Sequence, residues 1–321
     1  MPELFTGVQV VEDGTPKQVD TLFEKGSLLV SDVNLVQPPY PNSFVVLKSL
    51  NKQSAVCRIS RDGKKLLLIK DPRASGLKPR NKEQTMLLST LLDDSIPVQI
   101  VTGKAGTGKT LLALAAAMHK VEEGTYDKII MTKPMSQVGK YELGILPGTV
   151  QEKFLPFLMN YATNIEVLLG SAAEHAKEEK RKGAKRGNGN GMVTTDSYSS
   201  AMSNLMADFL TTYNVEIVPI QVFRGASFQK AVIIVDEIQV LGTHEILTIG
   251  TRVAEGSKLI LMGDLNQRDE NIAKKATGLW KAIHTEKMKQ SGLVSYIDLI
   301  KVERGPVAEL FASVFEDPDD K

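Results

Sequence analysis

The sequence predicts an α/β protein whose main domain contains a parallel sheet, preceded by a small β-rich domain. From about residue 98 onward, short and nearly continuous apolar runs alternate with stretches rich in helix-forming residues. This pattern is typical of parallel strands buried between two layers of helices. Residues 1–75 instead contain several short β-rich runs separated by turn signals. This difference places a domain boundary near residue 75.

Composition and charge set limits on the class of protein. The chain has 321 residues, of which 42% are hydrophobic and 24% charged, as in ordinary globular proteins. A formal net charge of +1 indicates that any nucleic-acid site is a local patch. The only cysteine, Cys57, permits no intramolecular disulfide and favours a reducing, cytoplasmic location. We find neither a signal-peptide pattern nor an apolar run of bilayer-spanning length, so we expect no membrane association.

Residues 1–75 are predicted to form a small β-barrel-like domain or a sandwich. The expected strands are 8–11, 27–33, 44–49, 54–60 and 64–70. Asp62 and Gly63 separate the last two strands and predict a hairpin. Two interpretations remain open for this domain. It is either a capping domain that packs on the rest of the chain, or a module that binds an oligonucleotide or a protein partner.

A proline- and glycine-containing linker at 71–79 precedes a predicted helix at 85–92. Two interpretations of the residues before this helix are equally supported. Asn81 caps the helix and Gln84 is a solvated side chain, or the Gln84 amide, which can both donate and accept, binds an adenine base.

The strongest motif is GKAGTGKT at 103–110, which fits the phosphate-binding pattern G-x-x-x-x-G-K-[ST] in full. A β-branched run at 98–102 comes before it and a helix-forming run at 111–118 follows it. In such a loop, backbone N–H groups and the N-terminal end of the helix bind phosphate oxygens. Lys109 is expected to reach the β- and γ-phosphates, and the Thr110 hydroxyl to hold Mg²⁺.

The candidate nucleotide-binding residues around this motif lie in the loop or directly after it. They are Gly103, Ala105, Gly106, Thr107, Gly108, Lys109, Thr110 and Leu111. The expected ligands are ATP and Mg²⁺.

The middle of the chain contains a strand and then an insertion. Residues 127–131 are a second apolar strand. A charge run with a basic excess at 174–186 leads into a Gly/Asn-rich stretch at 187–191. The composition predicts a flexible basic insertion at 172–195. It is either a solvated insertion or a loop that binds a nucleic-acid backbone by its charge.

Four further strands are predicted at 215–220, 231–235, 258–262 and 294–300. Asp236 and Glu237 follow the second of these, so Asp236 is expected to hold the metal and Glu237 to act as the general base for water. Gln267 follows the third strand, and it either senses the γ-phosphate or belongs to a polar turn.

Together these motifs resemble those of the PhoH-like ATPases, relatives of superfamily 1 helicases with one RecA-like domain. The similar stretches are RNKEQ at 80–84, GKAGTGKT, TKP at 132–134, LPG at 146–148, FRG at 223–225, VIIVDEIQ at 232–239, GDLNQ at 263–267 and VER at 302–304. The chain looks most like the ATPase half of proteins that join a PIN-type nuclease to a PhoH domain. It has no room for the nuclease, so RNA cleavage is not implied. The basic insertion, and Ile238 where the family often has Ala, depart from the pattern.

The resemblance implies a RecA-like P-loop NTPase domain over residues 76–321. It implies that Gln84 contacts adenine, that Asp236 and Glu237 act on metal and water, and that Gln267 senses the γ-phosphate. Arg224 and Arg304 match arginines of the pattern and are candidate catalytic residues.

Two hypotheses of function follow. In the first, a Mg²⁺-dependent ATPase couples hydrolysis to unwinding or remodelling of RNA or single-stranded DNA. In the second, the protein is a nucleotide-dependent switch or assembly factor without helicase activity. A small-molecule kinase is disfavoured, because a carboxylate next to the metal ligand suits water as the nucleophile.

The sequence also predicts self-association. Residues 75–321 contain a single copy of the phosphate-binding loop and its strands, with no second copy to supply the other wall of the site. An arginine that completes the site therefore comes from the same chain or from a neighbouring subunit. A head-to-tail contact closes into a ring when its rotation permits, and the family resemblance implies a homohexamer. Arg224 and Arg304 are the candidate arginines, and Arg252 is a weaker one.

Overall fold

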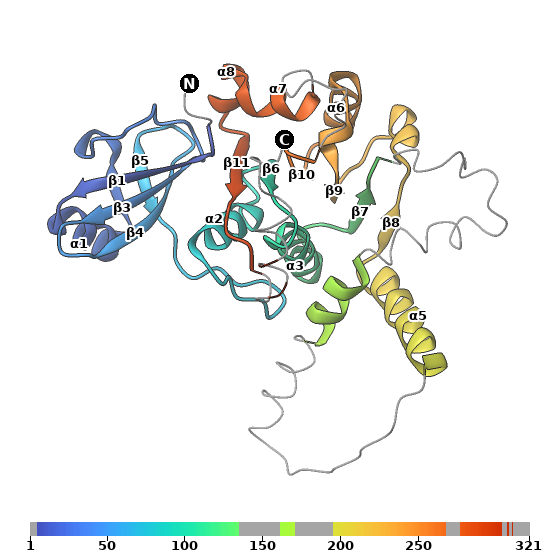
Figure 1. The fold of residues 1–321 in the computed structure, drawn as a ribbon. Helices are drawn as coiled ribbons and strands as arrows, with labels where there is room; N and C mark the ends of the chain where they lie inside the picture. The colour runs from blue at the N-terminus through green and yellow to red at the C-terminus, as the bar shows by residue number, and fades with distance from the viewer. Residues whose placement is uncertain are drawn as a thin grey trace, which may run out of the picture.

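The computed structural model describes residues 5–134, 161–170, 195–267 and 277–303, with positions 307 and 310. The described chain forms an N-terminal domain around a five-stranded sheet and a larger domain around a six-stranded sheet (Figure 1). Most of the predicted insertion, 172–194, lies outside the described residues, and residue 195 begins helix α5 (Thr195–Thr212). No helix in the described part of the chain is long and apolar enough to cross a lipid bilayer.

The N-terminal sheet has the strand order β1-β3-β4-β5-β2. Its strands are β1 (Val8–Gly14), β2 (Ser27–Leu29), β3 (Phe44–Ser49), β4 (Ser54–Ile59) and β5 (Lys65–Leu68). β1 runs parallel to β3, and the other neighbours are antiparallel. The predicted hairpin joins β4 to β5: the Asp62 carboxylate accepts a hydrogen bond from the Lys64 N–H at 3.1 Å, and Gly63 has a φ of 72°.

The sequence analysis missed one helix of this domain, α1 (Pro16–Lys25). Thr15 caps it, Pro16 occupies its first turn, and the Thr15 and Gln18 side chains form a capping box. Val19 and Leu22 on α1 are fully buried in the same apolar cluster as β3 and β4 residues. The strands therefore form a single open sheet with a helix packed on it, rather than the expected barrel or sandwich.

The larger sheet has the order β11-β6-β10-β9-β7-β8, and every neighbouring pair in it is parallel. Its strands are β6 (Val98–Gly103), β7 (Lys128–Thr132), β8 (Val215–Ile217), β9 (Ala231–Val235), β10 (Lys258–Gly263) and β11 (Val294–Leu299). The predicted α/β fold with a parallel sheet is confirmed. β10 lies between β6, which leads into the phosphate-binding loop, and β9, which leads into Asp236.

Helices cover both faces of this sheet (Figure 1). They are α2 (Lys82–Leu91), α3 (Lys109–Glu122), α6 (Thr243–Gly250), α7 (Gly278–His284) and α8 (Glu286–Lys289), with short 3₁₀ turns η3 (Ile220–Gly225) and η4 (Ile238–Val240). Val101 packs in one core cluster with α2 and α3, and its neighbour Ile100 packs in the other cluster with α6 and α7. Successive residues of a strand point to opposite faces, so each apolar strand contributes to both cores.

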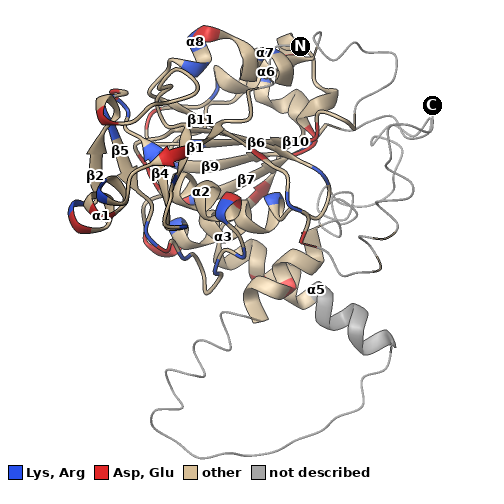
Figure 2. Ribbon diagram, turned by 60° about the vertical axis from the view of Figure 1, so that its left-hand side comes forward, with Lys and Arg blue, Asp and Glu red and all other residues tan. Residues whose placement is uncertain are grey.

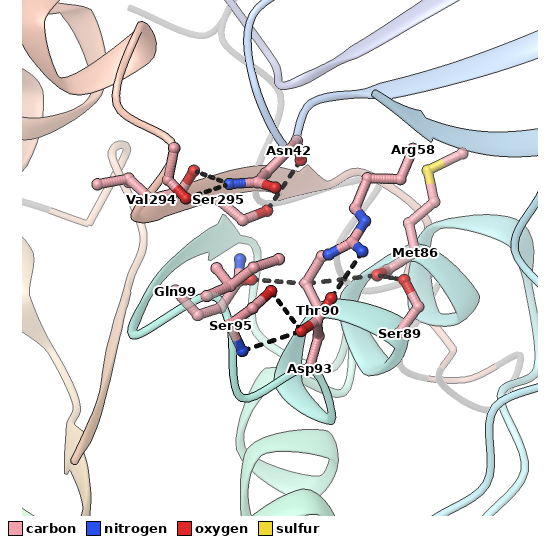
Figure 3. A network of polar contacts seen from close by, with 12 residues as sticks. Asn42, Arg58, Met86, Ser89, Thr90, Asp93, Ser95, Gln99, Val294 and Ser295 are labelled. Atoms are coloured by element: carbon pink, nitrogen blue, oxygen red, sulfur yellow. Dashed lines mark hydrogen bonds and ion pairs between the residues drawn. The ribbon is translucent and has the colours of Figure 1, made fainter. Parts of the chain in front are cut away.

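The N-terminal domain packs directly on the larger domain (Figure 3). The Asn42 side-chain amide donates to the carbonyls of Gly292 and Val294 at 3.1 and 3.2 Å, and the Ser295 hydroxyl donates to the Asn42 carbonyl at 3.2 Å. Arg58 on β4 forms a 2.6 Å ion pair with Asp93, which follows α2. Phe44 and Val46 also belong to the main apolar core of the larger domain. One face of the N-terminal sheet therefore contributes to the core of the larger domain, while the other face packs with α1 in a separate cluster.

The segment before β1 connects the two sheets. The Thr6 carbonyl accepts a hydrogen bond from the Asp298 N–H of β11 at 3.0 Å, and the Gly7 carbonyl accepts one from the Phe44 N–H of β3 at 2.8 Å. Gly7 has a φ of 79°, and a Cβ built on it would lie 2.0 Å from the Tyr296 carbonyl oxygen. Only glycine satisfies both the backbone angle and the close approach.

Replacement of Gly7 by alanine is expected to destabilise the protein more than the same change at Gly26. Gly26 also has a positive φ, of 73°, but nothing lies within 4 Å of its built Cβ. Backbone strain alone costs about 1–3 kcal/mol, and Gly7→Ala adds a steric clash at the junction of the sheets. Denaturant unfolding of both variants measures the difference. Equal losses of stability would show that the contact with Tyr296 contributes nothing.

Candidate active site

The phosphate-binding loop joins the C-terminal end of β6 to the start of α3. Gly103, Gly106 and Gly108 have φ values of 147°, 84° and 92°, in the region that favours glycine. A Cβ on Gly103 would lie 2.5 Å from the Leu299 carbonyl oxygen of β11. The Thr107 hydroxyl donates to the Lys104 carbonyl at 2.9 Å, which closes the loop on itself. The loop is thus shaped by its glycines and by close packing against β11.

Lys109 is the first residue of α3 and lies across the loop. Its ammonium group donates to the carbonyl oxygens of Gly103 and Lys104, the latter at 3.0 Å. Burial lowers the pKa of Lys109, and the negative charges of Asp264, Asp236, Glu237 and Asp298 oppose that shift. The Lys109 side chain is therefore held close to the loop and faces a group of carboxylates.

Gln84 lies in the first turn of α2 and forms a hydrogen bond to the loop. Its side-chain oxygen accepts from the Arg80 N–H at 2.9 Å, and its side-chain nitrogen donates to the Thr107 carbonyl at 3.0 Å. The Asn81 side chain caps α2 by accepting from the Gln84 N–H at 2.9 Å. The helix cap was one of the expected alternatives, but a solvated Gln84 was wrong, because only 6% of this residue is exposed. Its contact with adenine stays a prediction.

Asp236 and Glu237 follow β9 in the predicted place. One Asp236 oxygen accepts from the Glu237 N–H at 2.9 Å, and the other accepts from the Tyr161 hydroxyl at 3.1 Å. Burial raises the pKa of Asp236, the negative charge of Glu237 raises it further, and the Tyr161 hydrogen bond and Lys109 act in the opposite direction. Glu237 adopts a left-handed backbone conformation with a φ of 56°, which is strained for a residue with a side chain.

The turn after β10 carries the third group of site residues. The Asp264 carboxylate accepts from the Asn266 N–H at 2.9 Å, and the Asp264 carbonyl accepts from the Gln267 N–H at 3.2 Å. The polar turn expected at this point is therefore present. Asp264 is 5% exposed, whereas Gln267 is exposed and borders the cavity described next. The position of Gln267 is compatible with contact to a bound γ-phosphate, which stays a prediction.

These elements enclose a cavity of about 400 Å³ above the phosphate-binding loop. Its lining includes most predicted site residues: Gln84, Ala105, Gly106, Gly108, Lys109, Thr110, Leu111, Glu237 and Gln267. Gly103 and Thr107 support the loop from behind through the contacts given above. Asn164 and Val167, from the helix at 161–170, form another part of the wall.

The structure does not bring the candidate arginines into this cavity. Arg224 is exposed on η3 and lines a separate hollow with Glu245 and Thr248 of α6. Arg252 does not line the cavity either. Arg304 lies outside the described residues. Its neighbour Glu303 is placed against the loop, since the Glu303 N–H donates to the Gly106 carbonyl at 3.0 Å.

Sequence reasoning missed three residues that hold the site together. Tyr161 contacts Asp236, Gln239 contacts Glu237 at 2.6 Å, and the Glu303 carboxylate accepts from the Asn81 side-chain amide at 2.7 Å. Gln239 carried a local signal, its place two residues after Glu237, and Glu303 lies in the VER stretch at 302–304. Tyr161 and Glu303 come from segments far away in the sequence.

The residues present fit a magnesium ion bound together with phosphate oxygens. The described residues include no group of three or more His, Cys, Asp or Glu arranged as a metal site. Asp236 supplies a carboxylate and Thr110 a hydroxyl, both hard oxygen donors that suit Mg²⁺. The raised pKa of Asp236 reflects a buried carboxylate beside a second negative charge, and a cation relieves both effects.

Charge is distributed without one dominant sign over the described part of the chain. Lysines and arginines are interspersed with aspartates and glutamates over the described part of the chain in the view of Figure 2. This agrees with the formal net charge of +1. A surface for a polyanion is therefore expected to be local.

The fold and the site together define a P-loop NTPase. The family model described as "PhoH-like protein" matches residues 76–316, and the chain belongs to this family. Protein PhoH2 of Bacillus subtilis is 34% identical over 92% of this chain and 61% of its own length. Protein PhoH2 of Mycolicibacterium smegmatis is 28% identical over 95% of this chain and, again, 61% of its own length. The chain thus spans 61% of each of these curated relatives.

Among solved structures, the Pif1 helicase from Candida albicans is similar at 15% sequence identity and a TM-score of 0.33, over 75% of this chain and 44% of that one.

Replacement of Tyr161 by phenylalanine is expected to weaken Mg²⁺-dependent ATP binding. The hydroxyl orients Asp236, and loss of a hydrogen bond to a metal ligand typically costs about 10–100-fold in metal affinity. The matched control is Tyr213→Phe, because Tyr213 is also buried and donates to a carboxylate, Glu122, at 2.7 Å away from the cavity. Titration of Mg²⁺ against binding of a fluorescent ATP analogue measures both. If both variants depend on Mg²⁺ for binding of the ATP analogue in the same way, the role of Tyr161 is contradicted.

Proposed function

We propose that this protein is a Mg²⁺-dependent ATPase that couples ATP hydrolysis to unwinding or remodelling of RNA or single-stranded DNA in the cytoplasm. One observation carries the ATPase part of the proposal. A cation on the phosphate-binding loop, Lys109, a carboxylate after β9, Glu237, and an amide after β10, Gln267, all border one cavity. Side chains of these types are those that hydrolysis of a nucleoside triphosphate requires.

The loop binds the triphosphate in this proposal. Backbone N–H groups of residues 105–110 and the N-terminal end of α3 face the phosphates, and Lys109 exchanges its contacts with loop carbonyls for the β- and γ-phosphate oxygens. Gln84 borders the cavity beside Leu77 and Leu111, where an adenine base has both an amide and apolar side chains to contact.

Hydrolysis then proceeds at the β9 edge of the cavity. Glu237 accepts a proton from water as the water oxygen forms a bond to the γ-phosphorus. The bond between the γ-phosphorus and the bridging oxygen breaks, and that oxygen leaves with ADP. Mg²⁺, held by Thr110 and Asp236, neutralises charge on the β- and γ-phosphates when it is bound. Gln267 contacts the γ-phosphate oxygens and reports whether the phosphate is present.

The coupling to nucleic acid rests on the resemblance of the motifs to PhoH-like ATPases and on the basic composition of the insertion at 172–195. This is an argument by analogy with a fold family. Because the net charge is close to zero, the proposed contact is local and has to compete with salt.

We also propose a ring-shaped homo-oligomer, a hexamer, in which a neighbour completes the site. Within the described residues, no arginine apart from Arg80 lines the cavity. Arg80 belongs to the linker before α2 and lies at the Gln84 side of the cavity. Arg224 is exposed on η3 and is available to a neighbouring subunit. An arginine supplied in this way accelerates phosphoryl transfer by about 10³–10⁵-fold.

Substitutions at Lys109 and Glu237 are expected to separate binding from catalysis. Lys109→Ala removes the phosphate-binding cation, so both ATP affinity and hydrolysis should be lost. Glu237→Gln keeps the shape of the side chain without the base, so it should bind ATP and hydrolyse it about 10²–10⁴-fold more slowly. Binding and single-turnover assays test this pair. Hydrolysis near the wild-type rate in Lys109→Ala refutes the site, and loss of ATP binding in Glu237→Gln makes that residue structural.

Nucleic acid is expected to stimulate ATP turnover. The measurement is the ATPase rate with and without RNA or single-stranded DNA homopolymers, at two salt concentrations, because backbone contacts weaken as salt rises. Deletion of residues 175–191 should preserve the basal rate and reduce the stimulation. A rate that does not respond to any polymer contradicts the coupling and favours a nucleotide-dependent switch or assembly factor.

Light scattering with ATP and Mg²⁺ is expected to show an oligomer. If a neighbour supplies the arginine, mixing Lys109→Ala subunits with Arg224→Ala or Arg304→Ala subunits restores part of the activity, because some mixed interfaces contain both intact groups. A strictly monomeric protein that hydrolyses ATP rapidly contradicts the proposal. An oligomer without rescue by either arginine variant means that a different arginine completes the site or that the site is completed within one chain.

A further inference from the structure

A buried glutamine connects two parts of the candidate active site that lie on different strands. Gln239 belongs to η4, just after β9, and is 3% exposed. Its side-chain nitrogen donates to a Glu237 carboxylate oxygen at 2.6 Å. Its side-chain oxygen accepts from the Asp264 N–H, in the turn after β10, at 3.1 Å. One amide thus joins the candidate base to the turn that carries Gln267.

The surrounding backbone is shaped to admit this amide. A Cβ built on Gly263 would lie 2.8 Å from the Gln239 side-chain oxygen, closer than real Cβ contacts allow. Glu237 itself takes a left-handed conformation with a φ of 56°. Strain of this kind persists only where surrounding contacts impose it. The hydrogen bond from Gln239 is one interaction that holds the Glu237 side chain in place on this strained backbone.

An amide is suited to this position because it has a donor and an acceptor at its two ends. The donor end faces the carboxylate and the acceptor end faces a backbone N–H. A carboxylate in the same place would repel Glu237, and an apolar side chain would leave the Asp264 N–H buried without this partner. Both ends of the amide are therefore needed for the connection.

We propose that Gln239 is a positioning residue that holds the Glu237 carboxylate for catalysis and links it mechanically to the Asp264–Gln267 turn. This inference rests on the proposed ATPase function. When the γ-phosphate is bound or released, the turn shifts and the Asp264 N–H moves with it. The Gln239 amide is hydrogen-bonded to this N–H, so it moves the Glu237 carboxylate in turn. Gln239 does not itself line the cavity and reaches it only through Glu237 and the Asp264 turn, so it acts on the rate of the chemical step and not on ATP affinity.

The first test compares two buried glutamines. Gln239→Met keeps the length of the side chain and removes both hydrogen bonds. It is expected to lower kcat by about 10–100-fold, because small misplacements of catalytic groups have effects of this size, with ATP affinity within about threefold of wild type. The control is Gln99→Met on β6: Gln99 is fully buried, and it accepts from the Thr90 hydroxyl at 2.6 Å. The control should lose stability and keep its kcat.

The second test is a double-mutant cycle with Glu237→Gln, measured by single-turnover hydrolysis. If Gln239 acts through Glu237, Gln239→Met causes little further loss in the Glu237→Gln background. Equal losses in both backgrounds, or a changed ATP affinity with an unchanged kcat, overturn the inference. If Gln239→Met does not fold, Gly263→Ala displaces the retained amide and is expected to lower kcat in the same way.

The outcomes that contradict the proposed ATPase function differ from those that contradict the role of Gln239. A wild-type protein that binds ATP without hydrolysing it, or a Glu237→Gln variant with the wild-type rate, contradicts the ATPase proposal itself. A wild-type protein whose hydrolysis depends on Glu237 but not on Gln239 contradicts only this inference.

Discussion

The parallel order of the large sheet is the constraint on which the rest of the structure depends. Because all its strands run the same way, the C-terminal ends of β6, β9, β10 and β11 meet at one edge. The phosphate-binding loop, Asp236 and Glu237, and the Asp264 turn each begin where one of these strands ends. The loop, Glu237 and the Asp264 turn, which are separated by more than a hundred residues of sequence, therefore border one cavity, as ligand sites of open α/β sheets do.

Charge balance at that edge is as important as geometry. Lys109 is partly removed from water and faces carboxylates from three strand ends, while Asp236 is buried beside Glu237. Neither the Lys109 charge nor the carboxylate charges would be stable there without the other, because burial of an isolated charge is costly. The observed arrangement offsets this cost within the protein through Lys109, Tyr161 and backbone N–H groups.

The N-terminal domain is more than an attached module, because its removal would open the core of its neighbour. Phe44 and Val46 share a hydrophobic cluster with α2 and β11, and the segment at Thr6 and Gly7 bonds to both sheets. β11 also packs against the glycine that starts the phosphate-binding loop. The domain therefore supports the strand on which the loop rests, which places its contribution to the site behind the loop rather than inside the cavity.

The sequence by itself determined the features that local patterns encode. Apolar strands, the glycines of the loop, the Asp62-Gly63 hairpin and the carboxylates after β9 depend on neighbouring residues only, so they were predictable. The Pro16–Lys25 helix was missed although Thr15 and Gln18 signalled its cap. Tertiary structure alone decided three contacts of the site. Tyr161 meets Asp236, Glu303 lies against the loop, and the Gln239 amide connects the segments that follow two strands. Such contacts join residues far apart in sequence, and only the packing of strands and helices determines which of them meet.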